Sequence, residues 1–378
     1  MEATPPPLSK VRRTLKVRWY RCPIDKEELR QLMQRSDLRG AFQAVGHLAL
    51  WGATGTAAFL CFHHQLWIGF AVALWLHGTV GSFMRGIASH ELVHGTVFRT
   101  MWLNRLFVRI YATLGWFNFK EYQMSHTYHH RFTLHPDGDR EVVLPRNPML
   151  RFLQWLQLWT VNLTFRKEAN GILPVLWLNL RSAFNRYPDP WIEAVYEGHP
   201  DARREAVNWS RWVLLFHAVT AGVFIAIGQP ILIVLFNVHF CIANWLKHYV
   251  GLPMHCGLRD NVPDFRLCVR SITLDPISEF LYWRMNWHTE HHMFAGVPCY
   301  NLARVYRQVK DDMPVPRTLI GAWREMRQTW RRQQEDPDYV FNTPLPPTAH
   351  PEVLHEKDVA ESDELAASIG DLAPKALA

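Results

Sequence analysis

Four apolar runs, arranged as two close pairs, constrain the fold of this 378-residue chain most strongly. They span residues 41–62, 66–84, 211–228 and 230–247. Each run approaches the ~20 residues that a helix needs to cross a bilayer. Because only a short turn separates the two members of a pair, each pair predicts a transmembrane helical hairpin. We therefore expect an all-α integral membrane protein with two such hairpins and a cytoplasmic helical cap.

The distribution of basic residues predicts how the hairpins are oriented. The two turns expected at the outer side, 63–65 and 228–230, contain no Lys or Arg, whereas residues 10–40, 85–151 and 259–332 contain many. Positive charge is enriched on the cytoplasmic side of membrane proteins, so both termini and the cap should face the cytoplasm. The membrane would be the endoplasmic reticulum in a eukaryotic host or the inner membrane in a bacterial one.

Composition divides the chain into three parts. Residues 1–40 form a basic arm that begins with a Pro-rich stretch, and residues 41–332 form the membrane domain. Residues 333–378 predict an acidic, disordered tail, because they have little apolar periodicity. From Glu335 onward, ten Asp and Glu stand against two Lys, a charge of −8 that leaves +15 on the remainder of a chain of net charge +7. A basic body suits anionic lipid headgroups, and no nucleic-acid-binding motif accompanies it.

Two further apolar stretches, 101–117 and 150–182, are interrupted by Arg and Lys. Charge at the centre of a bilayer is costly, whereas Trp155, Trp159 and Trp177 suit the membrane–water interface. We expect amphipathic helices that lie in the membrane surface, with additional spans as the alternative.

Eight of the twenty histidines fall into three short motifs. The motifs are His90-Glu-Leu-Val-His94, His126-Thr-Tyr-His129-His130 and His288-Thr-Glu-His291-His292. Spacings of three and four place side chains on one face of a helix, so each motif directs two or three imidazoles at one point. The predicted hairpins bring all three motifs to the same side of the membrane. A solvated polar face would explain one such motif but not three.

The last apolar run ends in Asn244-Trp-Leu-Lys-His248, where the first and last residues again lie on one helix face. His248 is therefore a candidate ninth imidazole, and Asn244 is a candidate weaker or water-mediated ligand. The alternative is that both are polar residues at the end of a span. His239 and His255 lie nearby, and we interpret both as structural.

Eight or nine imidazoles exceed what one ion accepts, so the sequence predicts two metal ions. Imidazole suits Zn, Cu, Fe and Ni, but Zn is redox-inert and its structural sites usually include Cys, which favours iron that activates O₂. Ligating histidines normally donate their other N–H to a carboxylate or carbonyl. The carboxylate candidates are Glu91, Asp137, Asp139 and Glu290. The first motif also fits a zinc-protease signature with Glu91 as general base, which leaves the other two motifs unexplained.

The three motifs, in this order around two hairpins, resemble those of the membrane fatty-acid desaturases over about residues 41–316. The sequence around His90–Gly95, the stretch Asn286–Phe294 and the residues from Val297 to Leu302 look typical of that family. The resemblance implies two iron ions held by the motif histidines. Asn244 and His248 match the family's Asn-x-x-x-His element. The implied ligands are His90, His94, His126, His129, His130, Asn244, His248, His288, His291 and His292.

The resemblance implies O₂-dependent desaturation of an acyl chain or a similar apolar lipid. Electrons would come from a separate protein such as cytochrome b5 or a ferredoxin, because no donor domain is evident in the chain. Hydroxylation by the same centre is the alternative, since Asn244–Gly251 also resembles an element of the membrane alkane hydroxylases, whose second motif is spaced differently. In a histidine-rich metal carrier, by contrast, histidines should line the spans instead of gathering at one end.

Overall fold

The structure is a computed structural model that describes residues 6–142, 151–164, 171–187 and 189–359. Within these ranges the fold is helical apart from two short parallel strands, β1 (Ile272–Thr273) and β2 (Arg317–Thr318). Three helices are long and apolar enough to cross a membrane. They are α3 (Asp37–His63), α11 (Pro200–Ala226) and the stretch Trp67–Val93, in which α4 (Trp67–Ser82) continues through η1 (Met84–Ala88) into α5 (Ser89–Val93). The predicted all-helical class with apolar spans is confirmed.

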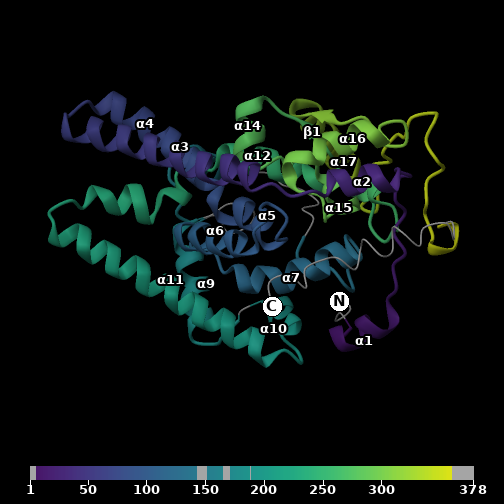
Figure 1. The fold of residues 1–378 in the computed structure, drawn as a ribbon, viewed down its shortest axis with the longest axis horizontal. Coiled ribbons are helices and arrows are strands. Elements are labelled where there is room, and N and C mark those ends of the chain that lie inside the picture. The colour runs from purple at the N-terminus through teal and green to yellow at the C-terminus, as the bar shows by residue number, and fades with distance from the viewer. Residues whose placement is uncertain (1–5, 143–150, 165–170, 188, 360–378) are drawn as a thin grey trace.

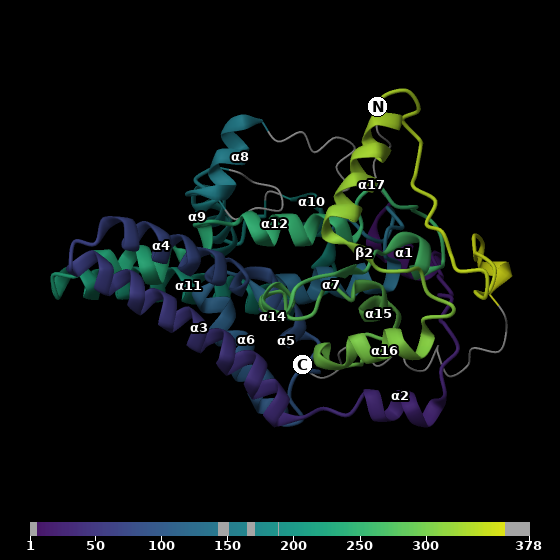
Figure 2. The ribbon, with the colours of Figure 1, turned by 90° about the horizontal axis from the view of Figure 1, so that it is seen from above.

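The first predicted hairpin is formed by α3 and α4, which pack against each other and project from the body of the protein (Figures 1 and 2). The side chain of Ser36 caps α3 by accepting the backbone N–H of Arg39. Gln65 turns the chain with a φ of +55°. Apolar side chains point outward, including Ile68 at 85% exposure, as expected for surfaces that face lipid.

The second hairpin consists of α11 and a returning segment that is not a regular helix. Instead of the span expected over 230–247, the chain forms the short helical segments η2 (Ile233–Asn237) and η3 (His239–Cys241), followed by irregular backbone. The backbone there pairs with the loop after α8: Asn162 N–H donates to the Cys241 carbonyl, and Ala243 N–H donates to that of Thr160. The expectation of a fourth continuous helix was therefore wrong.

The stretches 101–117 and 150–182 contribute no helix long enough to span a membrane in the part of the chain that the structure describes. They form α6 (Met101–Leu114), α8 (Phe152–Trp159) and α9 (Ile172–Ala183). Each helix buries one side and exposes apolar residues on the other, such as Trp102 on α6 and Phe152 on α8. This pattern agrees with helices that lie in the interface.

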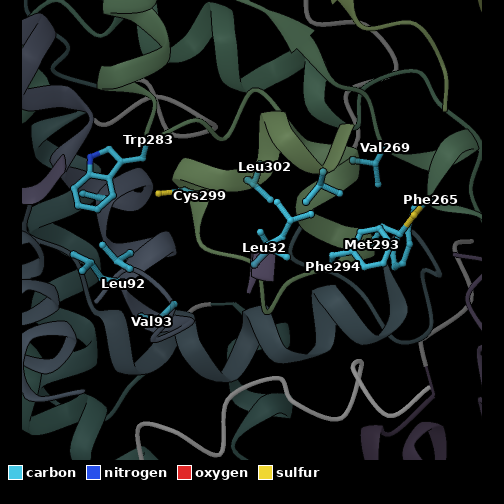
Figure 3. Close-up of a cluster of buried hydrophobic side chains, with 14 of the residues drawn as sticks. Leu32, Leu92, Val93, Phe265, Val269, Trp283, Met293, Phe294, Cys299 and Leu302 are labelled. Atoms are coloured by element: carbon cyan, nitrogen blue, oxygen red, sulfur yellow. The ribbon is translucent and has the colours of Figure 1, made fainter. Parts of the chain in front are cut away.

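The remaining elements form a helical body that contains one large hydrophobic core and smaller hydrophobic clusters. They are α1 (Leu8–Thr14), α2 (Lys26–Leu32), α7 (Phe119–Phe132), α10 (Pro190–Val195), α12 (Trp245–Gly251), η4 (Leu252–Met254), α13 (Phe265–Cys268), α14 (Pro276–Leu281), α15 (His288–Met293), η5 (Cys299–Asn301), α16 (Leu302–Val309), α17 (Leu319–Arg332) and η6 (Glu356–Asp358). Figure 3 shows that this core joins Leu92 and Val93 of α5, Met293 of α15, Leu302 of α16 and Leu32 of α2. Elements far apart in sequence are thereby fixed around the histidine motifs.

The described part of the tail, residues 333–359, has little regular secondary structure, and the Phe341 N–H donates to the carbonyl of Gly257 in the body. The guanidinium of Arg266 is fully buried and forms ion pairs with Asp264 and Asp312, each at 2.7 Å. It also donates to the carbonyl of Pro351 at 3.0 Å, which fastens the tail. The Pro-rich start, residues 1–5, and the end of the tail, residues 360–378, lie outside the described residues.

Candidate metal centre

The first histidine motif lies on α5, just beyond a break in the apolar helix that begins at Trp67. Leu92 and Val93 enter the hydrophobic core, so the helix is held from that side. His90 is buried, and the ring of His94 lies against it with centroids 4.9 Å apart. The two imidazoles therefore share one face, as their spacing predicted.

The other two motifs lie on α7 and α15. The side chain of Asn118 caps α7 by accepting the N–H of Glu121, which fixes the start of the helix that carries His126, His129 and His130. The side chain of Asn286 anchors the start of α15 by donating to the carbonyl of Ile272 at 2.9 Å.

Histidines from the three motifs meet in two groups. In each group, one candidate ligand atom per residue lies within 4.8 Å of every other. The first group is His90, His94, His126, His130 and His291. The second group is His129, His255, His288 and His292. The groups adjoin, because the rings of His130 and His292 lie 4.5 Å apart between centroids.

His255 is the ninth histidine of this arrangement, whereas the sequence predicts a structural role for it. Its Nδ1–H donates to the carbonyl of Cys268, so its bare Nε2 faces the Nε2 of His288 at 3.0 Å. No paired spacing marked this residue. The only sequence feature that could have predicted this ligand is its position just after the returning segment, which places it on the same side of the membrane domain as the motifs.

Asn244 and His248 do not join either group. The Asn244 amide donates to the carbonyl of Phe240 at 2.6 Å, and its oxygen accepts from Asn162 at 3.1 Å. The ring of His248 lies beside Trp323 of α17, with centroids 6.1 Å apart. The irregular backbone before α12 sets the direction of this helix, so regular spans could not predict where its side chains lie.

Carboxylates contact the outer nitrogens of several histidines. His90 Nδ1 lies 3.0 Å from Glu91, His129 Nδ1 lies 2.9 Å from Asp139, and His126 Nδ1 lies 2.8 Å from Glu141. Glu141 was missed because it belongs to no histidine motif and reaches α7 only through the loop after it. Glu290 instead accepts a hydrogen bond from Ser271, and Asp137 is exposed.

Burial keeps most of these imidazoles neutral, which is the form that binds a metal. It lowers the pKa of His94 and of His255 to about 3. His129 differs: burial lowers its pKa, but the carboxylates of Asp139 and Glu141 together more than offset burial, so the pKa is raised. Burial also raises the pKa of Glu141 to about 7.

The inner nitrogens of the two groups suit a cation. The Nε2 atoms of His90, His94 and His126 are buried without a hydrogen-bond partner. The Nε2 atoms of His130 and His291 face each other at 3.2 Å. Facing lone pairs repel unless a proton or a metal lies between them, and a buried polar atom without a partner is unfavourable. The nitrogen-only donor set fits a transition metal that accepts imidazole.

A cavity of about 220 Å³, lined by both polar and apolar side chains, lies beside residues that contact the first group. On one side it is lined by Tyr122 and Glu141, both of which contact Nδ1 of His126. On the other side it reaches Leu178 and Asn179 of the surface helix α9. The cavity thus extends from side chains that contact His126 to the helix α9.

Comparisons with known proteins agree with this geometry. The sequence model described as "Fatty acid desaturase" matches residues 65–323, more than half of the chain. The sn-1 oleoyl-lipid 12-desaturase of a Picosynechococcus species is 24% identical over an alignment of 245 residues, and the match covers 60% of this chain and 65% of that protein. The match therefore covers slightly less than two thirds of the relative's length.

Proposed function

This chain belongs to the fatty acid desaturase family, and we propose that it removes two hydrogens from an acyl chain of a membrane lipid in an O₂-dependent reaction. One observation carries the proposal: nine histidines from distant parts of the chain form two adjoining groups at the base of apolar helices. The name of the Picosynechococcus relative supports a lipid-linked acyl chain as the substrate class.

We assign one iron ion to each histidine group. Iron bound there would activate O₂ for abstraction of hydrogen from an unactivated C–H bond. The histidines of this chain act as neutral ligands, and Glu91, Asp139 and Glu141 orient three of them through their Nδ1 atoms. This assignment replaces His248 by His255 and leaves Asn244 as a residue that shapes the loop.

Residues 41–332 constitute the membrane desaturase domain in this proposal, with both termini in the cytoplasm. The tips of the two hairpins contact each other through His63 Nε2 and Gln229 Oε1 at 2.9 Å, which supports placing both turns on the same, outer side. Exposed arginines lie on two helices that are not part of the hairpins. Arg304 and Arg307 lie on α16, and Arg324 and Arg327 lie on α17. They suit an acidic electron donor such as cytochrome b5 or a ferredoxin.

Expression in a host of known lipid composition tests the proposal. The expected product lacks two hydrogens relative to a host lipid, whereas a product that gains one oxygen would identify hydroxylation instead. Purified protein should contain two irons per chain, and His291→Ala should lose both metal at the first group and product. His350→Ala is the matched control, because His350 is largely exposed and lies outside both groups. An active purified protein without iron would refute the assignment.

A further inference from the structure

The helix that starts at Trp67 is interrupted just before it delivers the first histidine motif. Arg85 has a ψ of 116° and Gly86 has a φ of +87°, so neither residue is helical. The chain resumes a helix at Ser89, one residue before His90. The direction of α5, and with it the position of His90 and His94, therefore depends on the geometry of this break.

The break frees one backbone carbonyl. In a regular helix the carbonyl of Arg85 would accept the N–H of Ser89, but that N–H donates to Gly86 instead. Lys247 of α12 reaches across and donates to the Arg85 carbonyl, with Nζ 2.6 Å from the oxygen. A buried carbonyl without a partner is unfavourable, so this contact stabilises the interrupted form over the regular helix.

We propose that Lys247 is a positioning residue, which holds the break at Arg85–Gly86 and so aligns His90 and His94 with the other three histidines of the first group. The inference rests on the proposed function, in that it takes this group to bind iron. Lys247 itself contacts no residue of the group in any interaction described for it.

The end of α6 holds the other side of the break through hydrogen bonds. The Arg85 guanidinium donates to the carbonyls of Gly115 and Trp116 at the end of α6. A Cβ at Gly115 would lie 2.9 Å from the Arg85 backbone, so the two segments are in close contact. Gly86 has the left-handed conformation that favours glycine, and any other residue there would be strained. With α6 fixed on one side, the Lys247 contact on the other side determines how α5 leaves the break.

An ordinary role for a lysine at a membrane surface is to extend its ammonium group toward the lipid headgroups. Lys247 is only partly exposed, and no ion pair between it and a carboxylate occurs among the described residues. Its one described hydrogen bond is directed inward to the Arg85 carbonyl. This geometry distinguishes a positioning role from a solvated one.

Iron(II) titration of the full-length protein in detergent tests the inference. Lys247→Met keeps the length of the side chain and removes the donor. We expect its affinity for iron at the first group to fall about 10-fold or more, the range seen when supporting contacts of metal ligands are lost, while the second group is unaffected. Lys247→Arg should restore most of the affinity, because it restores a donor. Exposed Lys310→Met is the matched control and should titrate like the wild type.

Hydrogen exchange provides a readout that does not depend on metal. The amides of residues 85–94 should exchange faster in Lys247→Met than in the wild type, whereas those of α15 should not change. Should Lys247→Met fail to fold, Gly86→Ala tests the same break, and we expect the same selective loss at the first group. A wild type that binds no iron would refute the proposed function. A wild type that binds two irons, with variants indistinguishable from it in both titration and exchange, would refute only the role of Lys247.

Discussion

His129 Nδ1 lies 2.9 Å from Oδ2 of Asp139, and both side chains are buried. The same carboxylate accepts the backbone N–H of Leu134 at 3.0 Å, so it is held by the turn that follows α7. Asp139 therefore fixes both the tautomer and the orientation of His129, and leaves its Nε2 directed at the second histidine group.

Replacing Asp139 by Asn should weaken metal binding at the second group. The amide cannot hold the imidazole as firmly as the carboxylate does, and loss of such a partner typically costs about 10- to 100-fold in metal affinity. Metal analysis of the purified variant measures the effect. Asp137→Asn, an exposed carboxylate two residues earlier, should retain the wild-type iron content. Equal iron in both variants would show that Asp139 does not support the site.

Substitutions of His255 and His248 should have opposite effects on iron binding, because only one of the two can be the ninth ligand. His255→Ala should deplete iron at the second group, because its Nε2 faces that of His288 at 3.0 Å. His248→Ala should retain iron, because its ring lies beside Trp323 and outside both groups. Iron content and thermal stability should be measured together for the two variants. The reverse pattern would restore His248 as the ligand.

Arg266 links distant segments and is expected to matter for stability rather than for metal binding. Arg266→Met leaves the carboxylates of Asp264 and Asp312 without their buried partner, which should cost about 3–5 kcal/mol in the free energy of unfolding. Thermal denaturation in detergent measures this loss, and Arg304→Met on the exposed face of α16 is the control. Folded Arg266→Met protein should still bind iron, since the residue contacts neither histidine group. Unchanged stability would contradict the role given to this cluster.

The proposed topology is open to a labelling experiment. In a Cys61→Ser background, Gln65→Cys at the outer turn should react with a membrane-impermeant thiol reagent applied to intact cells. Lys310→Cys at the end of α16 should react only after the membrane is permeabilised. Both positions are exposed in the structure, so accessibility differs only by the side of the membrane. Labelling of the two positions in the opposite order would invert the orientation.

Much of the architecture follows from local sequence patterns. An apolar run of sufficient length in the first hairpin must form a helix whose side chains face lipid, and α3 and the stretch from Trp67 do so. Spacings of three and four place imidazoles on one helix face whatever the surrounding fold, so the sequence alone predicts that the histidines of each motif point in one direction. Their meeting also followed from the number of chain reversals between them. The carboxylates Glu91 and Asp139 were predictable because they lie within or close after a motif.

Tertiary structure decided the features that depend on partners distant in sequence. Residues 230–247 are apolar enough for a span, but their backbone pairs with Thr160 and Asn162, and this pairing replaces the helix. The altered path brings His255 to His288, 33 residues away, and turns His248 toward α17. The positioning role of Lys247 likewise depends on its hydrogen bond to the carbonyl of Arg85, which is distant in sequence. A regular helix forms its backbone hydrogen bonds within itself, so it can be predicted from the periodicity of the sequence. A broken helix needs hydrogen-bond partners from distant segments, and only the folded chain supplies them.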